Sequence, residues 1–351
     1  VPWLKILNDT LVAVNQGGKR PGAGCAYLEP WHLDFEDFLN LRRNTGDERL
    51  RCHDMNTASW IPDLFMKRVQ EDGDWYMFCP SDCRELHETF GREFNTIYKD
   101  LCNRADKGEL KNFRKISAKE LWKKMLKVLF ETSHPWVTFK DPSNIRYSNQ
   151  HQGTVHSSNL CTEILLHTKP SKYEHGEKVE VGETAVCNLG SINLKSHLKT
   201  PSEAKSFSID KNLLASTIKT AVRILDNVID LNFYPTKEAE NANMQHRPIG
   251  LGMMATHDIL QLLDIQYDSD EAVKFIDELT EFFSYNAIFA SSKLAKEKGS
   301  YKTYSGSLWD QGILPIDTYN TLMSGRGVKK PALGSANINW DSLGEHITKY
   351  G

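Results

Sequence analysis

Short apolar segments of strand type alternate along this chain with longer segments whose apolar residues recur at helical spacing, and this alternation limits the folds open to it. Apolar runs predict strands at 25–28 and 136–139. Helical periodicity predicts helices over 1–16, 31–43, 212–231, 251–263, 269–298 and 340–350. Strands that alternate with helices are typical of α/β folds, in which helices cover a largely parallel sheet. We therefore expect an α/β architecture.

Two helix boundaries carry explicit signals. Ser117 and Glu120 have the spacing of a capping box and precede an apolar stripe, which predicts the start of a helix. Gly299 follows the last apolar position of 269–298 and predicts the end of that helix. A charged insert at 169–183 interrupts the pattern, and we expect it to project from the surface.

Charge and cysteine content narrow the class of protein. The 351 residues carry 43 Lys and Arg against 46 Asp and Glu, a net charge of -3, which excludes a broadly basic nucleic-acid binder. No apolar run approaches the roughly 18 residues of a membrane span. The seven scattered cysteines are an odd number for a disulfide scaffold. We therefore expect reduced thiols and a cytoplasmic protein without nucleic-acid or membrane partners.

A polar row interrupts the next strand-type segment, 159–166. The sequence around Cys161 is S-N-L-C-T-E-I. In an extended strand alternate side chains share a face, so Asn159, Cys161 and Glu163 would point the same way. A purely structural strand usually places apolar groups there. The row of amide, thiol and carboxylate therefore indicates a candidate reactive site.

The carboxylate of Glu163 favours a Cys161 that reacts as a neutral thiol. A nearby negative charge raises the pKa of a thiol because it disfavours the thiolate. A cysteine that exchanges a hydrogen atom needs no ionisation, so this arrangement suits it. Two alternatives stay open. One is a buried structural cysteine, and the other is a cysteine hydrolase using Cys161 with His156 or His151, which the same carboxylate disfavours.

A second strand-type segment, 185–194, contains another candidate cysteine. Its sequence A-V-C-N-L-G-S-I-N-L predicts a central strand that includes Cys187. If the two strands are neighbours, Cys187 could approach Cys161. Taken alone, a cysteine in such a strand is more often a small core residue than a redox centre.

Two other segments contain residues that could bind an anion or a metal. The glycine-rich stretch 16–24 lacks the spacing of either common phosphate loop, although Lys19 and Arg20 could meet an anionic ligand. Cys79 and Cys83 have no further ligands at zinc spacing, so no metal site is predicted.

In order and content, seven segments resemble the large, catalytic subunit of class I ribonucleotide reductase. They span nearly the whole chain and read Q-G-G-K-R-P-G-A, Y-L-E-P-W-H-L-D, I-P-D-L-F-M-K-R-V, S-N-L-C-T-E-I, A-V-C-N-L-G-S-I-N-L, H-R-P-I-G-L-G and G-I-L-P-I-D-T-Y. The resemblance implies a ten-stranded α/β barrel of two five-stranded parallel halves, with a central finger loop that carries a radical cysteine. It implies one incomplete barrel domain over 1–351, with a helix and specificity loop at 1–24 and active-site strands at 155–194.

The resemblance also implies a role for each matching residue. Cys161 would be the thiyl radical that takes the 3′-hydrogen of the ribonucleotide, and Glu163 the general base on the 3′-hydroxyl. Asn159 and Leu160 would contact the substrate, and Cys187 would belong to the reducing dithiol. The specificity loop would comprise Gln16, Gly17, Gly18, Lys19 and Arg20, with Arg20 also reaching the substrate.

Partners and cofactors follow from the same resemblance. The substrate would be a ribonucleoside diphosphate, and no cofactor would bind directly, because a metal-containing small subunit supplies the radical. Thioredoxin or glutaredoxin would be the reductant, and ATP and deoxynucleoside triphosphates would be the effectors. A homodimer is expected. The partner of Cys187, the N-terminal ATP-binding domain and the C-terminal part of the barrel would lie outside this chain, which would then be inactive without flanking pieces.

Two readings within the family remain as alternatives. One is an adenosylcobalamin-dependent, class II reductase. The residues after Cys161 and the L-E-P-W-H and G-I-L-P-I-D-T-Y segments look more like class I. The other is an inactive fragment that only assembles with further pieces, which the retained row of Asn159, Cys161 and Glu163 disfavours.

Overall fold

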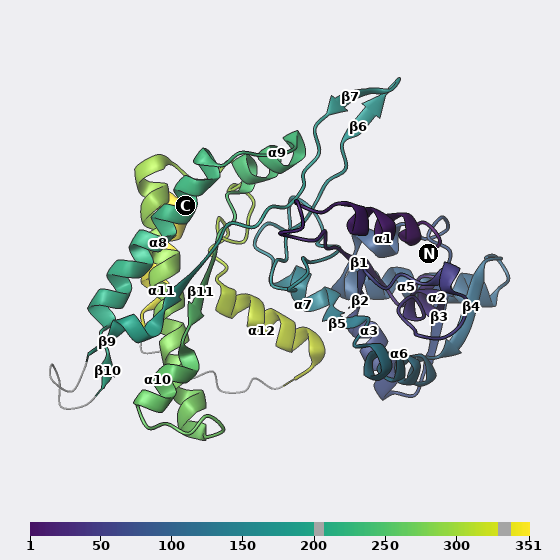
Figure 1. Ribbon diagram of the computed structural model, residues 1–351, viewed down its shortest axis with the longest axis horizontal. Coiled ribbons are helices and arrows are strands. Elements are labelled where there is room, and N and C mark those ends of the chain that lie inside the picture. The colour runs from purple at the N-terminus through teal and green to yellow at the C-terminus, as the bar shows by residue number, and fades with distance from the viewer. Residues whose placement is uncertain (200–206, 329–337) are drawn as a thin grey trace. The chain divides into compact units, whose positions relative to one another are not determined.

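The computed structural model describes residues 1–199, 207–328 and 338–351, and the chain divides into two compact units (Figure 1). Unit 1 is Val1–His167 and unit 2 is Thr168–Gly351. A hydrophobic cluster lies within each unit. Both units combine helices with parallel strand pairs, which confirms the expected α/β class.

A three-stranded parallel sheet organises unit 1. Its order is β1 (Cys25–Leu28), β2 (Asn56–Ile61), β5 (Trp136–Phe139), with β2 in the centre. The carboxyl ends of parallel strands meet at one edge, where ligands commonly bind in α/β proteins. Glu29 directly follows β1 and Lys140 directly follows β5, so both lie at this edge. The other elements of unit 1 are α1 (Leu4–Ala13), α2 (Phe35–Leu39), η1 (Glu48–Leu50), α3 (Asp63–Gln70), β3 (Asp74–Phe78), α4 (Glu85–Glu88), α5 (Gly91–Asp106), β4 (Phe113–Ser117), α6 (Ala118–Thr132) and α7 (Lys140–Ile145).

An aromatic cluster holds the helices of unit 1 against the β3–β4 antiparallel pair. Trp75 of β3 stacks on Tyr98 of α5 with ring centroids 4.4 Å apart, and Phe65 of α3 meets Trp75 edge-on at 5.0 Å. The hydroxyl of Tyr98 donates to the carbonyl of Tyr76 at 2.9 Å and accepts its N–H at 2.6 Å. Buried aromatic pairs of this kind add to the stability gained from burial alone.

Unit 2 packs two long helices against a pair of parallel strands. β8 (Leu189–Asn193) pairs with β11 (Gly250–Met254), and α8 (Lys211–Leu231) and α11 (Asp270–Lys298) supply most of the hydrophobic cluster. The other elements are β6 (Lys172–Glu174), β7 (Glu177–Glu180), η2 (Leu194–His197), β9 (Leu198–Lys199), β10 (Ser208–Ile209), α9 (Lys237–His246), α10 (Thr256–Leu262), α12 (Pro315–Arg326) and α13 (Trp340–Tyr350). In the three described ranges, no helix is long and apolar enough to cross a bilayer.

Many predicted elements are confirmed. β1, β5 and α13 have the predicted bounds, and α8 and α11 each begin within one residue of prediction. Ser117 caps α6 by accepting the N–H of Glu120 at 3.4 Å. Gly299 ends α11 with a positive φ of 90°. The charged insert forms the exposed β6–β7 hairpin, which projects from unit 2 (Figure 1).

Other predictions are wrong in extent or type. The helix predicted over 31–43 is reduced to α2, and the helix predicted over 251–263 begins as strand β11, because that segment pairs with β8. The strand predicted over 185–194 starts only at Leu189. The segment 159–166 forms no strand. The described residues contain parallel strand pairs but no closed barrel, so the ten-stranded barrel stays a prediction.

Candidate active site

The segment around Cys161 is a tight loop rather than the predicted strand. Residues 160–162 form a turn in which Thr162 has a left-handed φ of 67°. The base of the loop is closed by the hydroxyl of Ser158, which donates to the carbonyl of Ile164 at 2.7 Å. The side-chain oxygen of Asn159 accepts the N–H of Ile164 at 3.3 Å. Short polar side chains that bond nearby backbone groups compete with regular structure, which explains the error.

The candidate site residues of the loop differ in exposure. Cys161, Thr162 and Glu163 are exposed, whereas Asn159 and Leu160 are partly buried. The prediction that Asn159, Cys161 and Glu163 share one face of a strand is therefore wrong. In the structure Cys161 lies in the turn and Glu163 follows it directly, and both side chains are open to solvent. Asn159 uses its side-chain oxygen inside the loop, so its amide N–H groups are what it can offer a ligand.

A tyrosine from the parallel sheet anchors this loop. The hydroxyl of Tyr27, in β1, donates to the backbone carbonyl of Asn159 at 2.8 Å. The Tyr27 ring rests edge-on against Trp60 of β2, with centroids 5.9 Å apart. Burial, followed by the nearby Cys25, raises the pKa of Tyr27 to about 12, so the hydroxyl keeps its proton and remains a donor. The sheet therefore fixes where the Cys161 loop begins.

Removing the Tyr27 hydroxyl should loosen the loop. We expect Tyr27→Phe to cost about 1 kcal/mol in local stability, because one hydrogen bond is lost and the ring is kept. Hydrogen exchange of the amides of Thr162 and Ile164 should become faster by about fivefold at that cost. The matched control is Tyr173→Phe in the exposed hairpin, which should leave these amides unchanged. Equal exchange in Tyr27→Phe and the unchanged protein would show that the hydrogen bond does not hold the loop.

The glycine-rich segment forms a tight turn on the surface of unit 1. Gly17 and Gly18 have positive φ values of 60° and 76°, as the central positions of a type I′ turn require. The N–H of Lys19 donates to the carbonyl of Gln16 at 3.2 Å, and that of Gln16 donates to the carbonyl of Arg20 at 3.1 Å. All five residues are exposed, so the turn can reach a ligand from solution.

Cys187 lies just outside the strand in which it was predicted. It is exposed and precedes β8 in unit 2, whereas Cys161 belongs to unit 1. The following residue, Asn188, is buried and donates its side-chain amide to the carbonyl of Pro248 at 2.9 Å, while its own carbonyl accepts the N–H of Gly250. Asn188 therefore fixes the backbone beside Cys187 and leaves the thiol at the surface of the unit.

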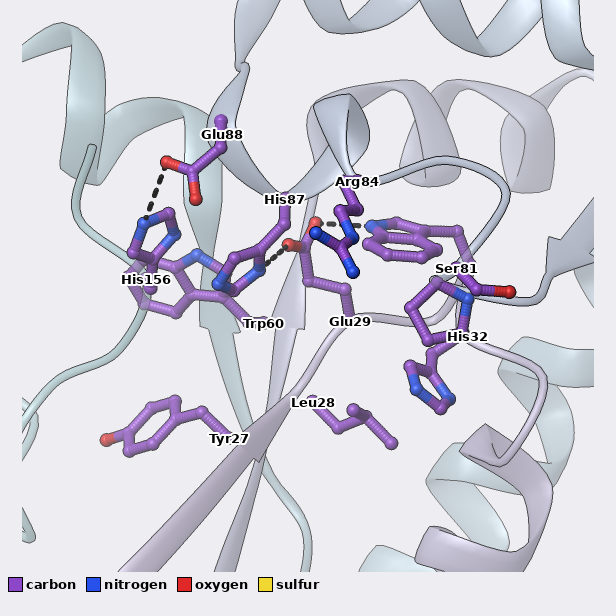
Figure 2. A pocket seen from close by; sticks show the side chains of 12 residues that line it. Tyr27, Leu28, Glu29, His32, Trp60, Ser81, Arg84, His87, Glu88 and His156 are labelled. Carbon is purple, nitrogen blue, oxygen red and sulfur yellow. Dashed lines mark hydrogen bonds and ion pairs between the residues drawn. The ribbon is translucent and has the colours of Figure 1, made fainter. Parts of the chain in front are cut away.

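A pocket at the carboxyl edge of the sheet was missed by the sequence reasoning. Its volume is about 550 Å³, and Figure 2 shows its lining residues. They come from β1, β2 and α4, from the loops that follow β1 and precede α4, and from the segment before the Cys161 loop. The rings of His87 and His156 stack almost parallel, with centroids 3.9 Å apart. Burial, followed by the neighbouring His87, lowers the pKa of His156 to about 4, so this imidazole is neutral near pH 7. His87 and His156 are far apart in the sequence, and no spacing signal links them.

A buried ion pair adjoins the pocket through Glu29, which lines it. Lys140 is fully buried, and its ammonium donates to both carboxylate oxygens of Glu29, at 3.0 and 2.9 Å. It also donates to the carbonyls of Leu86 and His87. The indole N–H of Trp31 donates to Glu29 at 2.7 Å. Every charge in this group is thus paired, as burial demands.

The geometry argues against the cysteine-hydrolase alternative. A nucleophilic thiolate needs a histidine within hydrogen-bond reach. Among the described residues no hydrogen bond joins Cys161 to a histidine. The ring of His156 instead contacts Glu88, with His156 Nε2 3.3 Å from a carboxylate oxygen.

Comparison with known proteins identifies the family of the chain. The family described as "Ribonucleotide reductase, barrel domain" matches residues 1–351. The chain is 53% identical over 352 residues to a ribonucleoside-diphosphate reductase subunit alpha of Chlamydia pneumoniae, covering 100% of this chain and 32% of the relative. It is 39% identical over 398 residues to the alpha subunit of Helicobacter pylori, covering 100% and 48%. It is also 39% identical over 353 residues to the large chain of Neurospora crassa, covering 100% and 35%. The chain thus spans about a third to a half of the length of these relatives, and it belongs to the ribonucleotide reductase barrel-domain family.

Proposed function

We propose that this chain provides the catalytic loop of a class I ribonucleoside-diphosphate reductase. The observation that carries the proposal is the anchored loop on which Cys161 and Glu163 are both exposed, in a chain that matches the family over its whole length. The finer fold that we propose is the family's ten-stranded barrel, of which the two parallel strand groups are parts. The Cys161 turn would be its finger loop.

The proposed reaction begins with hydrogen transfer to Cys161. As a thiyl radical, Cys161 takes the hydrogen atom from C3′ of the ribonucleotide, which leaves a thiol and a carbon radical. Glu163 takes the proton of the 3′-hydroxyl, and a base in this role must reach that proton directly. The 2′-hydroxyl accepts one proton, which balances the proton taken by Glu163, and leaves as water, so the net loss from the sugar radical is one water molecule. Asn159 and Leu160 hold the sugar, with the amide N–H groups of Asn159 as donors.

Two electrons and two protons must then reach the substrate. We assign Cys187 as one thiol of the dithiol that supplies them and ends as a disulfide. At the end of the cycle the thiol of Cys161 returns its hydrogen atom to C3′ and becomes a thiyl radical again. A cytoplasmic dithiol protein of the thioredoxin or glutaredoxin type would reduce the disulfide by thiol exchange. The radical itself would come from a metal-containing small subunit.

The exposed turn of Gln16, Gly17, Gly18, Lys19 and Arg20 is the proposed specificity loop. Its two glycines permit the tight reversal, and its two cations can meet the phosphates of a nucleotide. Arg20 would also reach the substrate. In this proposal ATP and deoxynucleoside triphosphates act as effectors, and two copies of the large subunit form a homodimer.

A chimeric enzyme tests the proposed function. This chain would replace the matched third of the Chlamydia pneumoniae alpha subunit, which supplies the rest of a large subunit. With a radical-generating small subunit and a dithiol reductant, we expect conversion of ribonucleoside diphosphates to deoxyribonucleoside diphosphates. A folded chimera with no reductase activity would contradict the proposal. Activity that needs adenosylcobalamin and no small subunit would instead support the class II alternative.

A further inference from the structure

The pocket at the carboxyl edge of the unit 1 sheet has the size and the walls of a small-molecule site. Its volume of about 550 Å³ is ample for a small organic ligand. Tyr27 and Trp60 line it with rings that meet edge-on, and the buried indole of Trp31 forms a further part of the wall. Aromatic side chains of this kind offer a flat apolar ligand a large contact area. All the lining residues belong to unit 1.

One cation at the pocket has no partner among the residues that the structure describes. Arg84 lines the pocket, and Figure 2 shows its guanidinium directed toward the middle of the lining residues. In residues 1–199, 207–328 and 338–351, no ion pair or side-chain hydrogen bond engages this guanidinium. The carboxylate of Glu29 also lines the pocket, but it is already paired with the buried ammonium of Lys140. The charge of Arg84 is thus available to an anionic ligand, and a guanidinium binds a carboxylate especially well.

His32 supplies a second donor to the lining of the pocket. Its Nδ1 accepts the N–H of Asp34 at 3.0 Å, so the proton of the neutral ring lies on Nε2. Burial lowers the pKa of His32, which keeps the ring neutral near pH 7. Within the described part of the chain, Nε2 has no hydrogen-bond acceptor. The pocket therefore offers one guanidinium and one neutral N–H group to a ligand.

We propose that this pocket binds a small organic carboxylate with a flat apolar body. The carboxylate pairs with Arg84, and the body lies against the aromatic wall. Glu88 also lines the pocket, but its side chain is largely exposed and contacts His156, so solvent screens its repulsion of the ligand. One guanidinium beside one neutral N–H group suits a singly charged carboxylate better than a doubly charged phosphate.

A ligand in this pocket would also contact the anchor of the Cys161 loop. The side chain of Tyr27 lines the pocket, and its hydroxyl donates to the carbonyl of Asn159. A ligand packed against the Tyr27 ring restricts the motion of this side chain. The liganded protein should therefore hold the loop more firmly, and this effect does not depend on the proposed reductase activity.

Equilibrium dialysis of the purified protein with two probes of one shape tests the site. The probes are 2-naphthoate and its neutral amide, 2-naphthamide. We expect 2-naphthoate to bind saturably and at least about fivefold more tightly than 2-naphthamide, because only the carboxylate pairs with Arg84. Saturating 2-naphthoate should also slow hydrogen exchange at the amides of Thr162 and Ile164 by at least about twofold. Unchanged exchange would overturn the link to the Cys161 loop.

Arg84→Gln separates recognition of the charge from packing of the ring. It should reduce the affinity for 2-naphthoate to that for 2-naphthamide and leave binding of the amide unchanged. Arg92→Gln is the matched control, because Arg92 is an exposed cation of α5 that does not line the pocket, and it should bind both probes normally. Ser81→Trp places a large ring in the pocket and should block both probes. Three results would overturn the proposal: no saturable binding, equal 2-naphthoate affinity in Arg84→Gln and the unchanged protein, or undiminished binding in Ser81→Trp.

Discussion

Replacing Cys161 with serine is expected to lower ribonucleoside-diphosphate reduction by the chimeric enzyme at least about 1,000-fold, which corresponds to about 4 kcal/mol of transition-state stabilisation. The O–H bond of serine is much stronger than the S–H bond of cysteine, so a serine cannot become the radical that takes the 3′-hydrogen. Cys161 is exposed at the tip of its turn, so the substitution leaves the folded loop in place. Product formation by chromatography measures the loss.

Cys79→Ser is the matched control for this substitution. Cys79 lies in a loop of the same unit, where its thiol is 3.0 Å from the hydroxyl of Ser81, and it has no role in the proposed reaction. The control should retain the activity of the unchanged chimera. If Cys161→Ser and Cys79→Ser reduce the substrate equally well, Cys161 is not the radical residue.

The largest effect on stability is expected at the buried ion pair. Lys140→Met should lower the free energy of unfolding by about 3–5 kcal/mol, because it leaves the carboxylate of Glu29 buried without its cation. Lys140 is fully buried and Glu29 nearly so, and the change also removes donors from two backbone carbonyls. Urea denaturation followed by tryptophan fluorescence measures the loss.

Two variants separate the charge effect from the change of side chain. Lys123→Met makes the same substitution at an exposed pair with Glu120 and should hardly move the unfolding midpoint. Adding Glu29→Gln to Lys140→Met should recover part of the lost stability, since no unpaired charge then remains. A Lys140→Met protein as stable as Lys123→Met would show that the pair contributes nothing measurable.

Local patterns predicted the elements whose formation depends on local chemistry. The capping box at Ser117, the stop at Gly299 and the apolar periodicity of α8, α11 and α13 gave nearly correct bounds. These signals act within one turn of helix, so one sequence suffices to read them. The helix predicted around Gly250 is wrong because the structure of this segment depends on a strand that is distant in the sequence. The segment forms strand β11 because it pairs with β8. Apolar periodicity alone does not distinguish such a short buried strand from a helix.

In the candidate site, too, local features could be predicted from the sequence and long-range contacts could not. The sequence around Cys161 and Glu163 is enough to identify both as candidate site residues. The alternation of side chains, however, predicts a strand where the structure has a loop. The anchor from Tyr27 to Asn159 and the cluster of His87 with His156 join segments that are distant in the chain. Such contacts arise from the way the parallel sheet assembles, and no local pattern encodes them.

Hydrogen abstraction at C3′ is the central claim, and an isotope experiment tests it most directly. The active chimera would be given a ribonucleoside diphosphate with deuterium at C3′ and, in parallel, the unlabelled substrate. If Cys161 breaks the C3′–H bond, deuterium slows reduction under conditions where abstraction limits the rate, and the product retains the label at C3′ because the same thiol returns it. Equal rates under those conditions, or complete loss of deuterium to solvent, would contradict the account.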